Sequence, residues 1–341
     1  RASDWSSDVC SSDLIYKKVR LIEDQISALA IGCWNFGGDW DSSNDDNTRE
    51  IVHAAIANGI NFFDVAPVYG WYHSEEVLGK ILEEGGLRNK VIIASKAGLL
   101  WDENHKTRNN LSRASLMEEI DGSLKRLRTD HIDIYQMHWP DHNVPIEETA
   151  QALADIKKAG KIRYVGLSNF SQADVEKFQK IVPVECQQGL YNMLERNTPS
   201  YHGIPLEYKT EDEMLVTVKK YGQAFLPYSP YMQGLLTGRF TREKKFSSTD
   251  IRNENPKFTT PEVYAKYYDC YEQLAAFAKE MGRPMNEICV NWLRQKEEVT
   301  AIIGGASSVK QLEGNIHAMT WDIQPDEMAK INEIIEPFRE L

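Results

Sequence analysis

The sequence predicts an α/β protein that folds as one closed (β/α)8 TIM barrel. Eight short apolar runs alternate with longer segments of helical period, and eight parallel strands are the number that closes such a barrel. Each run is continuous rather than alternating and is rich in Val, Ile, Phe and Tyr, as expected for strands buried on both faces. The runs occupy residues 28–34, 60–64, 91–96, 132–138, 162–168, 184–188, 225–228 and 301–304.

An open doubly wound sheet is the competing architecture. Such sheets usually carry a G-x-G-x-x-G loop between the first strand and the following helix. Gly37-Gly38 follows the first run, but no helix begins at the required distance, so this signature is absent. The closed barrel is therefore preferred.

The helical segments are recognised by apolar residues at a spacing of three or four. The first contains Ile51, begins at cap-type residues around 46–48 and stops at Asn58-Gly59. The second follows Ser112 and carries Leu116, Ile120, Leu124 and Leu127 on one face. The others are expected at 147–159, 171–181, 211–221, 261–281, 286–296, 308–318 and 325–336, where the last closes the C-terminus. Residues 189–210 and 231–260 are left as long βα loops over the C-terminal face of the barrel.

Composition restricts the classes of function. Of 341 residues 42% are hydrophobic and 26% charged, and the net charge is 39 − 51 = −12. A globular chain this acidic, without clustered Lys or Arg, is a poor candidate for binding nucleic acid or an anionic membrane surface. Five scattered cysteines without C-x-x-C spacing favour a reducing compartment, and no secretory or bilayer-spanning segment is recognised, so a cytoplasmic location is expected.

The first fourteen residues differ from the rest of the chain. They are rich in Ser and Asp and lack periodicity, and the stretch DWSSDVCSSDL resembles the translation of a sequencing-adapter oligonucleotide. We therefore expect residues 1–14 to be a non-native tail, with a natural flexible tail as the alternative, and residues 15–341 to form the barrel domain.

Polar residues that end neighbouring strands are the first candidates for catalysis, because TIM-barrel active sites lie at the C-terminal ends of the strands. The second, third and fourth runs end in Asp64, Lys96 and His138, and Tyr69 lies in the loop after Asp64. A carboxylate, an ammonium, an imidazole and a phenol are thus expected at one rim. A single charge at a strand end is usually only solvated, but four converging groups predict an active site.

Five separated blocks of the chain resemble the aldo-keto reductase family. They are the run 61–70 (NFFDVAPVYG), the following Ser74-Glu75 with Gly79, and the stretches 137–141 (MHWPD), 160–170 (GKIRYVGLSNF) and 303–308 (IGGASS). The resemblance covers roughly residues 15–341, and it is closer to the bacterial, potassium-channel-β-subunit-like branch than to the aldose reductase branch.

The resemblance implies that a carbonyl is reduced, or an alcohol or sugar oxidised, by hydride exchange with a nicotinamide cofactor. In this scheme Tyr69 is the general acid and Lys96 lowers the pKa of its phenol from the usual value near 10. Asp64 pairs with Lys96, and His138 donates a hydrogen bond to the substrate oxygen. The implied partner is a small carbonyl compound, alcohol or sugar, and no metal is required.

The resemblance also implies where the cofactor binds. Ser168, Asn169 and Gln188 match carboxamide ligands, and Tyr228 matches the aromatic residue that stacks on the nicotinamide ring. The residues matching the pyrophosphate and adenosine contacts are Ser229, Pro230, Gly234, Leu235, Arg239, Gly305, Ser307, Gln311 and Asn315. For Ser307 and Gln311, helix capping is the alternative role.

NADP(H) is the expected cofactor and NAD(H) the alternative. Ser307, Ser308, Lys310 and Gln311 gather at the start of a helix and suit a 2′-phosphate, and the loop holds no carboxylate that would repel one. Arg239 or Arg252 could add a cation from the long loop 231–260.

Two positions depart from the family pattern. Gly314 stands where Glu is usual, which removes one expected contact to adenine, and Tyr231 stands where Leu is common.

The substrate pocket is expected to have aromatic walls. Tryptophans at strand ends and in rim loops supply them, and packing within the loops is the alternative role for each: Trp34, Trp71, Trp101 and Trp139.

Two other functions compete with the reductase. One is a regulatory protein that binds the cofactor but turns over slowly. The other is a metal-dependent hydrolase using His138, Asp141 and His142, which is disfavoured because three ligands so close on one strand end cannot all face one ion well.

Overall fold

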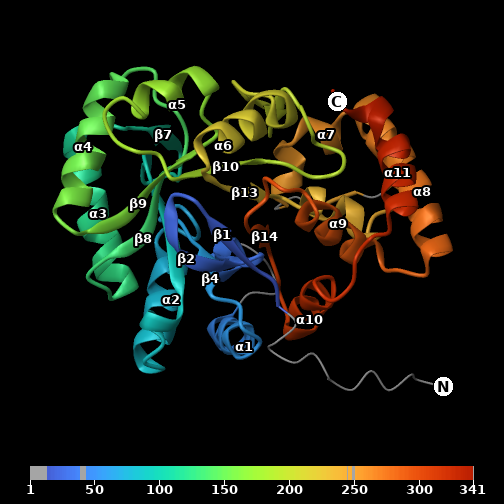
Figure 1. Cartoon of the computed structure of the whole chain (residues 1–341), viewed down its shortest axis with the longest axis horizontal. Helices are drawn as coiled ribbons and strands as arrows, with labels where there is room; N and C mark the ends of the chain where they lie inside the picture. The colour runs from blue at the N-terminus through green and yellow to red at the C-terminus, as the bar shows by residue number, and fades with distance from the viewer. Residues whose placement is uncertain (1–13, 39–43, 244, 248–249, 341) are drawn as a thin grey trace.

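The eight predicted strands form one parallel sheet in the computed structural model, which describes residues 14–38, 44–243, 245–247 and 250–340 (Figure 1). Neighbours in the sheet follow the order β13-β10-β9-β8-β5-β4-β3-β14. The strands are β3 (Leu29–Gly32), β4 (Phe62–Asp64), β5 (Ile92–Ala97), β8 (Ile132–Met137), β9 (Ile162–Ser168), β10 (Cys186–Leu190), β13 (Ala224–Tyr228) and β14 (Ile302–Gly304).

The two ends of this sheet meet, so the barrel is closed. The backbone N–H of Thr300 donates to the carbonyl of Phe225 at 2.9 Å, and the N–H of Phe225 donates to Thr300 Oγ1 at 3.1 Å. These bonds join the segment entering β14 to β13. The predicted fold class is confirmed.

A β-hairpin that the sequence did not predict covers the N-terminal end of the barrel. It consists of β1 (Tyr16–Val19) and β2 (Ile22–Ser27), and its Ile22 and Ile26 pack against the barrel interior, including Phe62 and Ile134. The N–H of Ser27 also donates to Asn61 Oδ1 at 2.9 Å, just before β4 begins. The hairpin therefore closes the barrel at the N-terminal ends of its strands.

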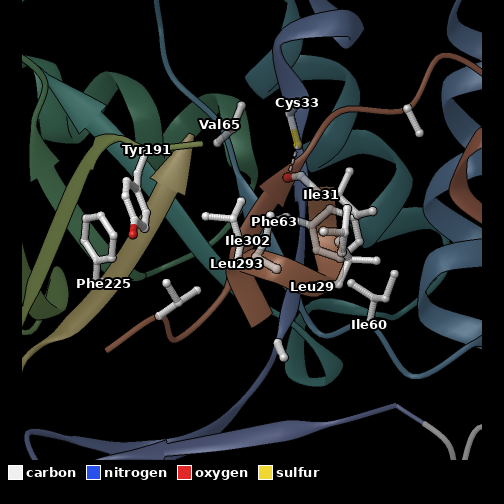
Figure 2. Close-up of a cluster of buried hydrophobic side chains, with 14 of the residues drawn as sticks. Leu29, Ile31, Cys33, Ile60, Phe63, Val65, Tyr191, Phe225, Leu293 and Ile302 are labelled. Atoms are coloured by element: carbon white, nitrogen blue, oxygen red, sulfur yellow. Dashed lines mark hydrogen bonds between the residues drawn. The ribbon is translucent and has the colours of Figure 1, made fainter. Parts of the chain in front are cut away.

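The outer faces of the strands pack against helices that surround the sheet. Figure 2 shows part of this layer, in which Leu29 and Ile31 of β3 and Phe63 of β4 lie near Leu293 of α9. The helices are α1 (Asp45–Ala57), α2 (His73–Glu84), α3 (Arg113–Leu127), α4 (Ile146–Lys158), α5 (Gln172–Phe178), α6 (Leu215–Tyr221), α7 (Pro256–Thr259), α8 (Pro261–Met281), α9 (Met285–Arg294), α10 (Val309–His317) and α11 (Pro325–Ile335).

The structure differs from the predicted elements in several places. Helix α2 was not predicted, and the first helix is capped by Asn44, whose side chain accepts from the Asn47 N–H, rather than by residues 46–48. Helix α6 is preceded by a π-helical turn at Thr210–Met214, and α7 lies within the expected loop 231–260.

Two small hairpins also lie in loops over the C-terminal face. The first, β6 (Leu99–Trp101) with β7 (Thr107–Asn109), follows β5, and the second, β11 (Ser200–Tyr201) with β12 (Ile204–Pro205), lies in the loop 189–210.

Of the expected tail, residues 1–13 lie outside the described residues, whereas Leu14 is buried against the core with 6% exposure. No described helix is both long and apolar enough to cross a bilayer.

Helices α2 and α3 approach closely because α2 has a glycine at the contact. A Cβ on Gly79 would lie 2.3 Å from the Arg126 carbonyl oxygen and 2.7 Å from Leu127 Cα. These are backbone atoms, so the helices would have to separate to admit a methyl group.

We predict that Gly79→Ala destabilises the protein by about 1–3 kcal/mol, the usual cost of overpacking a rigid contact. Gly314→Ala in α10 is the matched control, because its Cβ would meet Asn286 Nδ2 at an ordinary 3.4 Å. Helix propensity then makes the control neutral or stabilising by up to about 1 kcal/mol. Chemical denaturation measures both, and equal effects of the two substitutions would contradict the close-contact explanation.

Candidate active site

A buried ammonium links the first three predicted catalytic residues. Lys96 Nζ donates to Asp64 Oδ2 at 2.7 Å, to the Tyr69 hydroxyl at 3.1 Å and to the Val65 carbonyl at 3.2 Å. The Lys96 side chain is 0% exposed, so these three acceptors must replace its water shell. The ends of β4 and β5 thus hold a fully coordinated cation directly behind the phenol.

The fourth predicted residue, His138, faces the same phenol. The backbone N–H of His138 donates to the Ala97 carbonyl at 2.9 Å, which holds His138 at the end of β8 beside β5. The imidazole and the Tyr69 ring lie 6.1 Å apart and nearly perpendicular, at 82°. On the other side Trp34 stacks on Tyr69 with centroids 5.8 Å apart and planes within 7°. The structure brings all four predicted residues to one place.

Burial, rather than Lys96, decides the pKa of Tyr69. Loss of water around the phenol raises its pKa to about 12, and the Lys96 ammonium only partly offsets this increase. The expected net lowering of the pKa is therefore wrong for the protein as it stands. The phenol is protonated near neutral pH and can act as a proton donor.

The imidazole of His138 is neutral near pH 7. Its half-buried ring is largely withdrawn from water, which disfavours the charged form, and the Lys96 ammonium adds repulsion, so the pKa lies well below the usual 6.5. A neutral imidazole retains one N–H and can donate a hydrogen bond without carrying charge.

Two buried glutamines complete the surroundings of Asp64. Gln188 Nε2 donates to Asp64 Oδ1 at 2.8 Å, and Gln136 Nε2 donates to the same oxygen at 3.3 Å. The sequence singled out Gln188 but not Gln136, whose only signal was a polar residue in the middle of an apolar run. The carboxylate thus has partners on both oxygens.

Asn169 is more constrained than its expected role suggested. Its Nδ2 donates to the His138 carbonyl at 3.3 Å and to Ser168 Oγ at 3.1 Å, while its Oδ1 accepts from the hydroxyls of Tyr208 and Tyr228, each at 2.9 Å. Both hydrogens and both lone pairs of its amide therefore have protein partners. Asn169 joins the ends of β8, β9 and β13 and the loop 189–210.

The loop after β13 has an unusual backbone at the predicted pyrophosphate contacts. Ser229, Gln233 and Gly234 have φ of 57°, 50° and 99°, and this conformation is fixed by hydrogen bonds to backbone oxygens. Asn192 Nδ2 donates to the Ser229 carbonyl at 2.9 Å, and Arg252 Nη1 donates to the Gln233 carbonyl at 3.1 Å.

The other residues predicted for this loop differ in exposure. Leu235 is buried and Arg239 is exposed, and Pro230 stands between Ser229 and the unexpected Tyr231.

The predicted adenosine end lies between β14 and α10. Ser308, not Ser307 or Gln311, caps α10 by accepting from the Gln311 N–H, whereas Gln311 Oε1 accepts from the Ser307 N–H at 2.8 Å and from its hydroxyl at 3.0 Å. Gly305, at the start of this loop, is exposed.

A polar atom without a protein partner marks the inner side of this end. Asn315 is 3% exposed, its Oδ1 accepts from the Tyr231 hydroxyl at 2.5 Å, and its Nδ2 is buried without a partner in the described part of the chain. Buried amide hydrogens are rarely left unpaired, so Asn315 Nδ2 is an exception among the described residues.

The four predicted pocket tryptophans fall into three groups. Trp34 covers Tyr69, Trp71 and Trp101 contact each other at 5.3 Å, and Trp139 stacks against Tyr201 at 6.5 Å. Tyr201, on β11, also meets Tyr228 edge to face at 5.3 Å. It was not predicted, because its loop gave no signal beyond an aromatic residue.

The competing metal site is not assembled. His142 bonds to Glu207 at 2.7 Å, and Asp141 Oδ2 accepts from the Leu111 N–H at 3.1 Å. Among the residues that the structure describes, no three His, Cys, Asp or Glu side chains gather as metal ligands would.

The chain belongs to the aldo/keto reductase family, whose pattern matches residues 28–336. It is therefore a nicotinamide-dependent oxidoreductase, and enzymes of this family act on small carbonyl compounds or sugars.

The relatives it matches extend over nearly its whole length. It is 36% identical to the aldo-keto reductase YhdN of Bacillus subtilis (92% of this chain, 91% of the relative) and 31% identical to L-glyceraldehyde 3-phosphate reductase of Escherichia coli O157:H7 (91% and 89%). Its fold matches the solved structure of the glycerol dehydrogenase AKR11B4 from Gluconobacter oxydans with TM-score 0.83 and 32% identity, covering 95% of each chain.

The lowered pKa of His138 makes the stability of the protein depend on pH. In the unfolded chain His138 takes up a proton as the pH falls through about 6.5, whereas the folded ring, with its lowered pKa, does not. We predict that the fall in melting temperature between pH 7.5 and pH 5.5 is smaller in His138→Gln than in the unmodified protein. His53→Gln, which changes an exposed histidine of α1, controls for the loss of one imidazole. An undiminished fall in His138→Gln would contradict the assignment.

Proposed function

We propose that the protein is an NADP(H)-dependent enzyme that reduces an aldehyde or ketone, or oxidises the corresponding alcohol or sugar, with Tyr69 as the general acid. The observation that carries this proposal is the buried Lys96 ammonium, which lies 3.1 Å from the Tyr69 oxygen and 2.7 Å from Asp64. A buried cation held against a phenol stabilises the phenolate that remains after a proton is donated.

A nicotinamide cofactor held by these residues would supply a hydride to the carbonyl carbon, or accept one from the alcohol carbon. Tyr69 then transfers its hydroxyl proton to the substrate oxygen as negative charge develops there, and Lys96 stabilises the phenolate. Asp64 keeps Lys96 oriented and offsets its charge. The neutral imidazole of His138 donates a hydrogen bond to the same substrate oxygen, so the carbonyl is held between two donors. In the direction of oxidation, the Tyr69 phenolate accepts the proton.

The residues present suit a dinucleotide. The unpartnered Asn315 Nδ2 can donate to a ring nitrogen of adenine, and Gly305, Ser307 and Gln311 stand beside it at the start of α10. Ser229, Pro230, Gly234, Leu235 and Arg239 would cover the pyrophosphate. Tyr228, Ser168 and Gln188 would hold the nicotinamide end near Tyr69. Asn169, the fourth predicted residue, would act through Ser168 and Tyr228, because its own amide already bonds to protein groups.

The substrate is proposed to enter between the aromatic groups at the rim. Trp34 stacks on the catalytic Tyr69, Trp139 stacks against Tyr201, and Trp71 contacts Trp101. The names of two relatives point to short hydroxylated compounds, glyceraldehyde 3-phosphate and glycerol. A panel of sugars, aldehydes and ketones, followed by the absorbance of the reduced cofactor, tests this proposal, with glyceraldehyde among the first compounds.

We predict that Tyr69→Phe lowers turnover by about 10²–10⁴-fold, because it removes the proton donor. Cofactor binding, measured by quenching of protein fluorescence, should change little. Turnover near that of the unmodified protein would refute Tyr69 as the acid.

Lys96→Met should be as damaging. It removes the cation that favours the Tyr69 phenolate and leaves Asp64 buried without its ion-pair partner. If this variant kept both the rate and its pH dependence, the role assigned to Lys96 would be wrong even with Tyr69 as the acid.

We predict that NADP(H) binds at least tenfold more tightly than NAD(H), a difference of about 1.4 kcal/mol. Lys310 is an exposed cation at the start of α10, and Arg239, in the loop after β13, is also exposed, whereas Arg252 is held by Asp250 at 2.5 Å. Fluorescence titration of both cofactors measures the ratio. Arg239→Gln and Lys310→Gln should reduce it, whereas Lys330→Gln on distant α11 should not. Equal or reversed affinities in the unmodified protein would contradict the preference.

A further inference from the structure

We propose that Gln136 is a positioning residue that fixes the amide of Gln188 so that its oxygen accepts a hydrogen bond from the nicotinamide carboxamide. This inference rests on the proposed function, since it assigns part of the cofactor site. Gln136 would touch neither cofactor nor substrate, and it would act entirely through Gln188.

Gln136 lies inside the barrel beside the catalytic cation. It is 0% exposed, and the strand register pairs it with Lys96 on β5 and with Gly166 on β9. A Cβ on Gly166 would come within 2.6 Å of Gln136 Cγ, so only glycine leaves room for this side chain. An amide placed so deeply among strands needs partners for its polar atoms.

Its partners are Asp64 and Gln188. Gln136 Nε2 donates to Asp64 Oδ1 at 3.3 Å, and Gln136 Oε1 accepts from Gln188 Nε2 at 3.3 Å. Gln188 Nε2 also donates to Asp64 Oδ1 at 2.8 Å. The NH₂ group of Gln188 is therefore directed at two acceptors, one of them a carboxylate.

This arrangement excludes the alternative orientation of the Gln188 amide. If that amide turned by 180°, its oxygen would face the Asp64 carboxylate and the Gln136 oxygen, neither of which can donate. Gln136 can present its oxygen to Gln188 only because its own NH₂ is directed at Asp64. Asp64 thus fixes Gln136, and the two together fix Gln188.

The oxygen of Gln188 remains available for a ligand. No described donor reaches it, and it is not among the fully buried, unpaired atoms of the described residues, so part of its surface is accessible. The neighbouring Ser168 Oγ accepts from Asn169 and keeps its own hydrogen for donation. An acceptor beside a hydroxyl donor matches the NH₂ and the oxygen of a carboxamide.

The test compares NADPH with the analogue in which a methyl ketone replaces the carboxamide, the reduced 3-acetylpyridine form. This analogue keeps the oxygen but lacks the NH₂ that Gln188 would receive. Dissociation constants of both are measured by fluorescence quenching for the unmodified protein, Gln136→Leu and Gln188→Leu. Gln187→Leu is the control, because Gln187 is also buried on β10 but bonds to Gln223 instead, at 2.6 Å.

We expect the unmodified protein and Gln187→Leu to prefer NADPH over the analogue by about tenfold, and Gln136→Leu and Gln188→Leu to reduce this preference to about twofold. The double variant should show no further loss, because both residues act on one hydrogen bond. An unchanged preference in Gln136→Leu would overturn the proposal, as would a purely additive double variant.

If Gln136→Leu does not fold, Gln136→Met provides the same comparison, since its unbranched chain fills a similar volume. Failure of the proposed function would look different. In that case the unmodified protein would bind neither cofactor, and no ratio could be formed.

Discussion

The site depends on one constraint, which is that a fully buried ammonium must be surrounded by acceptors. Lys96 reaches three of them, and the carboxylate among them needs donors of its own, which Gln136 and Gln188 supply. Removing a charge from water costs several kcal/mol unless its partners compensate. The ends of β4, β5, β8 and β10 are therefore linked by hydrogen bonds around Asp64 and Lys96. The bond from Lys96 in turn helps to position the Tyr69 hydroxyl.

The strands and the catalytic residues could be predicted because their signals are local. Continuous apolar runs identify strands buried on both faces, and a polar residue that ends such a run must lie at the rim. Helix α2 was not predicted. It carries an apolar stripe of Val77, Leu78, Ile81 and Leu82, but Gly79 in its middle lowers the helix propensity of the segment. The hairpin at Ser200–Pro205 is too short to leave any periodic pattern.

Properties that arise only from packing could not be predicted from the sequence. The pKa of Tyr69 is an example, since the effect of Lys96 was predicted with the right sign but the larger effect of burial was invisible. Gln136 and Tyr201 are others. Each acquires its role from a residue that is distant in the chain, Gln188 in one case and Trp139 in the other.

The hairpin β1–β2 closes one end of the barrel, at the N-terminal ends of the strands. Ile22 and Ile26 form its base at the end of the strands opposite the loops 189–210 and 231–260. The residues that stabilise the barrel at this end are thus separate from the loops over the C-terminal face, where cofactor and substrate are proposed to bind. Exchange of these loops between related enzymes should therefore change which substrate is bound, while the packing of the hairpin and the stability it provides stay the same.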